Sequence, residues 1–96
     1  MVTAKEMITE AIVVLDRDGW CQGAETNNRG QRCAVGALKS AYKVRAPVQF
    51  DTFLEAIETV RREVGSVQLS YWNDQEGRTQ AEVRAAFVRA LEKGEG

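Results

Sequence analysis

Apolar residues recur at the spacing of an amphipathic helix in four separate stretches of the chain. Within each stretch, apolar side chains lie three or four positions apart, with polar and charged residues between them. The predicted helices begin at Thr3, near Gln31, between Pro47 and Thr52, and at Thr79. This pattern predicts an all-α protein, a compact bundle of four helices.

Two of these helices carry a recognisable amino-terminal signal, the capping box. In this arrangement a threonine and a glutamate three residues later each bond the backbone N–H of the other. Thr3 and Glu6 fit the first helix, and Thr79 and Glu82 fit the last. At the other end of the first helix, Gly19 is suited to a left-handed cap.

The segments between the helices differ in character. Residues 20–31 predict a loop or a short irregular hairpin, because Asn-Asn-Arg-Gly at positions 27–30 favours a tight turn. Before the last helix, Val67, Leu69 and Tyr71 alternate with polar residues, which predicts a short extended segment. A single helical turn fits these residues nearly as well.

Packing is expected to centre on the second helix. Its predicted contact face carries Ala34, Gly36, Ala37 and Ala41, whose small side chains would let another helix approach closely. The larger apolar residues of the four stripes are expected to form much of the core: Ile12, Leu15, Leu38, Phe50, Phe53, Leu54, Ile57 and Phe87.

Composition and charge limit the classes of function. The 96 residues are 44% hydrophobic and 28% charged, which is typical of one globular domain, predicted to span residues 1–96. A net charge of −1 disfavours a general nucleic-acid binder, which needs a clustered basic excess. No apolar run approaches a membrane span, and the amino terminus lacks a secretory pattern. We therefore expect no membrane partner and a cytoplasmic location.

The inventory of reactive side chains is short. With two cysteines and no histidine, the chain cannot assemble the usual Cys/His zinc sites or a Ser-His or Cys-His catalytic pair. We therefore expect no metal and no cofactor. Cys33 lies near a predicted helix start, which predicts a lowered pKa for its thiol. Cys21 and Cys33 are either free or paired, and the sequence leaves both alternatives open.

The candidate binding residues lie beside the two tryptophans. They form one group after the first helix and another before the last: Trp20 and Gln22, then Trp72, Asn73, Asp74 and Arg78. An indole offers a stacking surface, an arginine a planar donor fork, and Asn and Asp fixed polar groups. The same residue types also build turns and fill cores, so a purely structural role is the competing interpretation. For a joint site, the two groups must meet at one end of the bundle.

Three short motifs occur in order along the chain: Gly19-Trp20-Cys21-Gln22-Gly23, Cys33-Ala34-Val35-Gly36-Ala37-Leu38, and Trp72-Asn73-Asp74 through Gly77-Arg78-Thr79-Gln80-Ala81-Glu82-Val83. Together they resemble a small uncharacterised family found in actinobacteria and in the phages that infect them. The resemblance spans nearly the whole chain. It implies no known activity, but it implies a short, soluble accessory protein that a phage could encode.

Three hypotheses of function follow. The first is a small non-catalytic interaction protein, phage-encoded, that binds and modulates a host macromolecule, with a protein as the expected partner. The second is a small-molecule or nucleotide-binding protein with a pocket between the two tryptophan segments. The third is a thiol-dependent enzyme, which the absence of a histidine base disfavours. The sequence predicts no oligomeric state.

Overall fold

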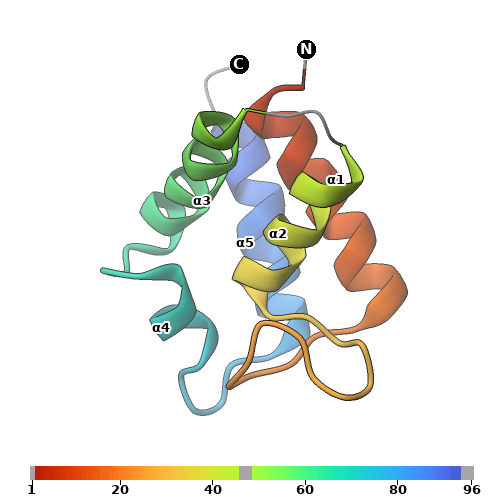
Figure 1. The fold of residues 1–96 in the computed structure, drawn as a ribbon. Helices are drawn as coiled ribbons and strands as arrows, with labels where there is room; N and C mark the ends of the chain where they lie inside the picture. Colours follow the sequence, from red (N-terminus) through yellow and green to blue (C-terminus); the bar gives the residue numbers. More distant parts are fainter. Residues whose placement is uncertain (1, 46–48, 94–96) are drawn as a thin grey trace.

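Five helices account for most of the described chain, which comprises residues 2–45 and 49–93 (Figure 1). In this computed structural model the helices are α1 (Ala4–Asp18), α2 (Ala34–Val44), α3 (Phe50–Val64), α4 (Leu69–Asn73) and α5 (Gln80–Lys93). Apart from isolated bridges, no strand forms in the described residues. The all-α prediction is therefore confirmed, while a helix start at Pro47 lies outside the described residues.

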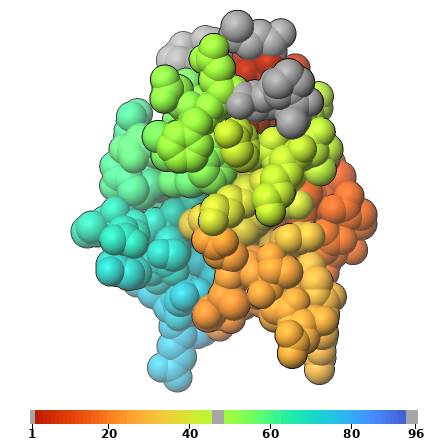
Figure 2. Space-filling view, in the orientation of Figure 1, coloured from red at the N-terminus to blue at the C-terminus, as the bar shows by residue number. Residues whose placement is uncertain are grey.

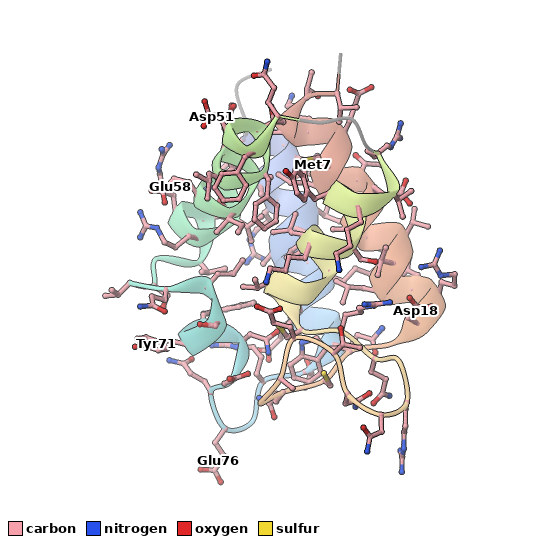
Figure 3. The ribbon with its side chains drawn as sticks, viewed as in Figure 1. Met7, Asp18, Asp51, Glu58, Tyr71 and Glu76 are labelled. Carbon is pink, nitrogen blue, oxygen red and sulfur yellow. The ribbon has the colours of Figure 1, made fainter. Side chains whose placement is uncertain are left out.

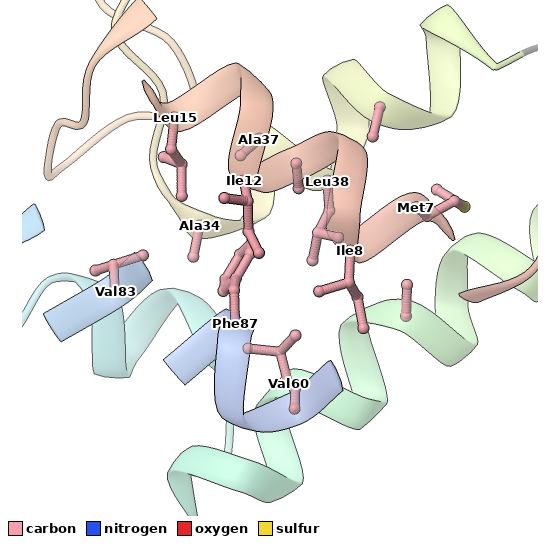
Figure 4. Close-up of a cluster of buried hydrophobic side chains, with 14 of the residues drawn as sticks. Met7, Ile8, Ile12, Leu15, Ala34, Ala37, Leu38, Val60, Val83 and Phe87 are labelled. Carbon is pink, nitrogen blue, oxygen red and sulfur yellow. The ribbon is translucent and has the colours of Figure 1, made fainter. Parts of the chain in front are cut away.

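The hydrophobic core lies where α1 packs against α2, α3 and α5. Figure 4 shows side chains that these four helices contribute to it. The buried residues labelled there are Met7, Ile8, Ile12 and Leu15 from α1, Ala34, Ala37 and Leu38 from α2, Val60 from α3, and Val83 and Phe87 from α5. Full burial of each large aliphatic or aromatic side chain stabilises the fold by roughly 1.5–3 kcal/mol.

Both predicted capping boxes form. Thr3 N–H donates to Glu6 Oε1 at 2.8 Å, and Glu6 N–H donates to Thr3 Oγ1 at 3.1 Å. The second box repeats this geometry, with distances of 2.9 Å and 3.2 Å between Thr79 and Glu82. Gly19 caps α1 with φ of 92° and ψ of 174°, so its φ is positive as expected, but its ψ lies outside the left-handed helical region.

The short helix α4 replaces the predicted extended segment and makes five helices in the described residues instead of four. Leu69, Trp72 and Asn73 are buried, whereas Val67 and Tyr71 are 81% and 61% exposed. The buried positions are therefore three and four residues apart, which is the helical period. An alternating strand would have placed residues 67, 69 and 71 on one face, whereas in the structure only Leu69 of these three is buried.

The second helix begins at Ala34, later than the predicted start near Gln31. The reason is that Arg32 still belongs to the loop, where its backbone N–H donates to the carbonyl of Gly19 at 3.0 Å. The close approach expected at Gly36 is made by the loop, not by another helix. A Cβ on Gly36 would lie 2.0 Å from the carbonyl oxygen of Glu25, so the contact requires glycine.

The core residues expected on α1, α2 and α5 are buried, but on α3 more residues were expected in the core than the structure buries. Phe53 is buried, whereas Phe50 is 56% exposed, Leu54 is 46% exposed and Ile57 is half-buried. The apolar stripe of α3 covers a broader arc than its neighbouring helices can bury. The ring of Phe50 packs instead at the edge of the fold, with centroid distances of 6.2 Å to Tyr42 and 5.7 Å to Phe53.

Candidate functional site

The two tryptophan-bearing segments meet at one end of the molecule, at the bottom of Figure 1. We call this end, formed by residues 20–31 and 72–79, the loop pole. Trp20 donates its indole N–H to Oδ1 of Asn73 at 2.7 Å. Gln22 donates from Nε2 to the backbone carbonyl of Asn73 at 3.0 Å. The convergence that a joint site requires is therefore present.

Asn73 lies at the centre of the loop pole and is fully buried. Its Oδ1 accepts hydrogen bonds from Trp20 Nε1 at 2.7 Å and from the backbone N–H of Ala34 at 2.9 Å. Its Nδ2 donates to the Cys21 carbonyl at 3.2 Å and to the Asp74 carboxylate at 2.9 Å. One amide therefore joins the long loop, the start of α2 and the end of α4, with its full donor and acceptor capacity in use.

Trp72 and Arg78 form a stacked pair in the second segment. The guanidinium carbon of Arg78 lies 4.1 Å from the centroid of the Trp72 ring, a cation–π contact. Arg78 also donates from Nε to the Trp72 carbonyl at 3.0 Å, and its Nη2 bonds the side chain of Gln75. Trp72 is 9% exposed. The pair holds the turn that precedes α5.

The long loop is shaped by the turn predicted at residues 27–30. Oδ1 of Asn27 accepts hydrogen bonds from the backbone N–H groups of Arg29 and Gln31, both at 3.0 Å. Gly30 donates to the Asn27 carbonyl at 3.0 Å and has a φ of 78°, which glycine adopts without strain. The turn brings the chain back to Trp20, which forms an isolated bridge with Arg32.

The two thiols are free and buried, so they form no disulfide in this structure. Cys33 is the N-cap of α2, and its Sγ accepts a hydrogen bond from the Gly36 N–H at 3.3 Å. Burial nevertheless raises the pKa of the Cys33 thiol, which corrects the expectation of a lowered pKa. Burial also raises the pKa of Cys21, whose Sγ donates to two backbone carbonyls. A raised pKa is the opposite of the change that activates a thiol as a nucleophile.

A hollow of about 450 Å³ opens beside the loop pole, and we call it the α3–α4 hollow. This volume lies within the roughly 300–1,000 Å³ of typical ligand pockets. Figure 2 shows the orange loop and the teal segment around α4 on the same face. The lining residues come from four elements: Gly23, Ala24 and Glu25 of the loop, Cys33 and Val35 of α2, Ile57 and Arg61 of α3, and Val67, Gln68, Leu69, Ser70 and Asp74 around α4.

Two ion pairs border this hollow. Lys39 Nζ lies 3.0 Å from Glu25 Oε1. Arg61 donates from Nε to Glu58 Oε1 at 2.9 Å and from Nη1 to the carbonyl of Ser66 at 2.7 Å. Hydrogen bonds from Arg61 lower the pKa of Glu58 to about 2. The charges of Glu25 and Arg61 are therefore already balanced by neighbours.

Among the six candidate residues, Asp74 alone lines the α3–α4 hollow. Its Oδ1 accepts from the Gly23 N–H at 3.0 Å, which fixes the carboxylate at the edge of the hollow. The side-chain polar contacts found for the other five lie within the loop pole and at the starts of α2 and α5. A role of these five residues in binding stays a prediction, and their internal bonds support the structural interpretation made from turn chemistry.

Sequence reasoning missed the apolar lining of the hollow. Ile57 was assigned to the core, and Val35 and Val67 were not considered as site residues. A usable signal exists on α3, whose stripe of Phe50, Leu54 and Ile57 is wider than a single packed face requires. Excess apolar width on one helix favours an exposed apolar surface, although it does not identify which edge is left open.

In the part of the chain that the structure describes, no group of three or more His, Cys, Asp or Glu side chains is placed to hold a metal ion. None of the described helices has the length and apolar character needed to cross a membrane. Residues 1–93 match the model of DUF6197, a family of unknown function. No curated protein and no solved structure matches the chain.

Proposed function

We propose that this chain, which belongs to the DUF6197 family of unknown function, is a small non-catalytic interaction protein. It binds a macromolecular partner, expected to be a protein, and modulates that partner's activity. We further propose that the chain comes from an actinobacterium or one of its phages and acts in the host cytoplasm. The resemblance carried by the three motifs supports this origin.

The observation that carries the proposal is the set of exposed apolar side chains on α3, on α4 and just before α4. Phe50 is 56% exposed, Leu54 46%, Val67 81% and Tyr71 61%. Figure 3 shows Tyr71 directed away from the fold. Single exposed apolar residues are ordinary, but several on two helices that contact each other and both contribute to a hollow favour a protein-binding surface.

The loop pole supports this surface from one side. Asn73 and its partners hold α4 against the long loop, and α4 carries Tyr71 on its outer face. A preorganised surface binds more tightly than one that must be ordered on contact. The candidate residues therefore serve the proposed function by fixing the surface, and Asp74 and Gln22 are exposed at its edge.

The test is capture of a specific partner from a host lysate by the tagged protein, with identification by mass spectrometry. The variants Leu54→Ser and Tyr71→Ser change exposed apolar residues of the proposed surface, and each should reduce recovery of the partner. Val13→Ser is the matched control, because Val13 is 48% exposed but lies on α1. Failure to recover any partner at several bait concentrations would contradict the proposal.

A second candidate function is binding of a small molecule, which the 450 Å³ hollow favours. The hollow opens beside the loop pole, but neither Trp20 nor Trp72 nor Arg78 is part of its lining. Asp74 would repel a phosphate, so a nucleotide is the less favoured ligand. A thermal-shift screen with nucleotides, anions and apolar amines tests this candidate, and no stabilisation by any of them would exclude it for those classes.

A further inference from the structure

The α3–α4 hollow combines apolar walls with one acidic group that has no counter-ion among the described residues. We propose that it takes an apolar side chain from a basic partner segment, in which a leucine or aromatic residue stands next to lysine or arginine. This inference rests on the proposed function, because it names the chemistry of the partner that the protein binds.

The apolar part of the argument comes from the lining. Val35 and Ile57 are half-buried and Val67 is 81% exposed, so apolar surface from α2, α3 and the segment before α4 faces the same hollow. Covering this surface with an apolar side chain removes it from water. An apolar anchor entering a pocket is the usual form of a strong contact in protein interfaces.

The electrostatic part comes from the three charged residues of the lining. Glu25 is paired with Lys39, and Arg61 is bonded to Glu58 and to a backbone carbonyl. Asp74 forms no ion pair with any described residue, and its Oδ2 accepts no hydrogen bond from them. Its Oδ1 is held by Gly23 and Asn73. A fixed carboxylate with one unused oxygen favours a lysine or arginine beside the anchor.

A neighbouring charge favours the same partner. Glu76, which follows α4 two residues after Asp74, also has no ion-pair partner among the described residues, and Figure 3 shows it at the outside of the molecule. The basic residues without such a partner are Lys5, Arg29 and Lys43, and none of them lines the hollow. Complementary charge raises association rates and selects against acidic partners.

The occupant is a peptide segment and not an isolated small amine, because the two helices that contribute to the hollow expose further apolar side chains, Tyr71 on α4 and Leu54 on α3. A segment of several residues can cover these side chains while one anchor fills the hollow. An isolated small amine would fill the hollow but leave these two side chains uncovered.

The experiment is a titration of the ¹⁵N-labelled full chain, followed by amide chemical shifts, with three capped hexapeptides: GKLWKG, GELWEG and GKSSKG. We expect GKLWKG to shift the amides of Val35, Ile57, Val67 and Asp74 together, with saturation below about 10 mM. The acidic peptide and the peptide without an apolar anchor should bind more weakly by at least about five-fold. Equal binding of the acidic peptide, shifts scattered over other faces, or no binding of GKLWKG would overturn the inference.

Two variants test the assigned contacts. Asp74→Asn keeps an oxygen that can accept from Gly23 but removes the charge, and it should weaken GKLWKG binding by about two- to five-fold. Glu76→Gln is its control, with the same charge change outside the lining, and should bind as the parent does. Val67→Ser changes an exposed wall residue without disturbing the core and should also weaken binding, whereas Val13→Ser should not. Parental binding by both Asp74→Asn and Val67→Ser would overturn the inference.

Phenethylammonium, added to the same titration series, tests the alternative that the hollow binds a small amine. If this amine shifts the hollow residues as strongly as GKLWKG does, the occupant is a small amine and the peptide assignment is wrong. The lysate capture remains an independent test of the proposed function. A captured partner that is retained by Asp74→Asn and Val67→Ser would leave that function standing and remove this inference alone.

Discussion

A single side-chain amide joins the long loop and the start of α2 to the end of α4, which is distant from both in sequence. Asn73 connects to Trp20 and Cys21 in the long loop and to Ala34 at the start of α2. A buried polar group without partners is costly, so asparagine at a fully buried position implies a network that satisfies it. At this scale the loop pole is held by hydrogen bonds as well as by packing of its two tryptophans with the core.

Replacing Asn73 with alanine is expected to destabilise the protein by roughly 2–5 kcal/mol. The change leaves the Trp20 indole N–H and the Ala34 backbone N–H without their acceptor, and each unsatisfied buried donor costs about 1–3 kcal/mol. Urea unfolding followed by circular dichroism measures the effect.

Asn28→Ala provides the control for this prediction. Asn28 is exposed in the turn of the same loop, and its loss is expected to change stability by no more than about 0.5 kcal/mol. Equal stability of Asn73→Ala and Asn28→Ala would show that the network contributes little to folding.

At the scale of elements, the contact between α2 and the long loop depends on Gly36. Alanine at this position improves helix propensity by about 1 kcal/mol. Its Cβ, however, would lie 2.0 Å from the Glu25 carbonyl oxygen, and that oxygen belongs to the backbone and also accepts from the Cys33 N–H. We expect the steric effect to dominate and Gly36→Ala to lose roughly 1–3 kcal/mol.

Thermal unfolding of Gly36→Ala and Ser40→Ala tests this expectation. Ser40 lies in the same helix, so its replacement has the propensity gain without the close contact. A rise in melting temperature for both variants would mean that the loop moves away from α2 at little cost.

The ion pairs on α3 make the free energy of unfolding depend on pH in the acidic range. The pKa of Glu58 is lowered from 4.5 to about 2 by Arg61, and a lowered pKa means that the ionised form is favoured in the folded state. This contribution is complete above about pH 4.5 and is lost as the pH falls through 2.

Glu58→Gln should therefore be less stable than the parent near neutral pH, and the difference should shrink as the pH falls toward 2. Urea unfolding at several pH values measures this, and Glu55→Gln is the control, since Glu55 has no ion-pair partner in the described residues. A difference between parent and Glu58→Gln that stays constant from pH 7 to pH 2 would contradict the assignment.

Local signals predict most of the helices correctly. Both capping boxes form because they depend on residues three apart, which the sequence shows directly. The start of α2 is predicted too early, and for α4 the sequence leaves an extended segment and a helical turn both open, because tertiary contacts decide these two features. Arg32 is held in the loop by its bond to Gly19, and α4 exists because Leu69 and Trp72 are both buried by neighbours.

At the scale of the whole molecule, the meeting of the two tryptophan segments was predicted as a condition for a site, and it is found. A pocket between the two tryptophan segments was one hypothesis, but the apolar lining of the observed hollow was not predicted, because it is formed by side chains from four elements and depends on how α3 and α4 lie against the loop. Positions such as Val35 and Val67 have no distinctive sequence signal. Only their arrangement in space makes them neighbours.

The reaction rate of the buried thiols reports how often the structure around them opens. Burial raises the pKa of both Cys21 and Cys33, so few thiolates are available in the native state. We expect both thiols to react with an aromatic disulfide reagent at neutral pH at least about ten-fold more slowly in the folded protein than in denaturant.

The same reaction in Asn73→Ala should be faster than in the parent, because the variant opens the loop pole more often. Asn28→Ala should react at the parental rate. Fast reaction of either cysteine in the native parent would show that burial in the resting structure does not protect it.

Both tryptophans of the chain lie at the loop pole, and one of them is bonded to the residue that follows the other. Tryptophan fluorescence of this protein is therefore a local signal, which reports on the loop pole and not on the rest of the molecule. Far-ultraviolet dichroism instead averages over every helix. Recording both signals during one thermal unfolding experiment would show whether the loop pole unfolds before the helices do.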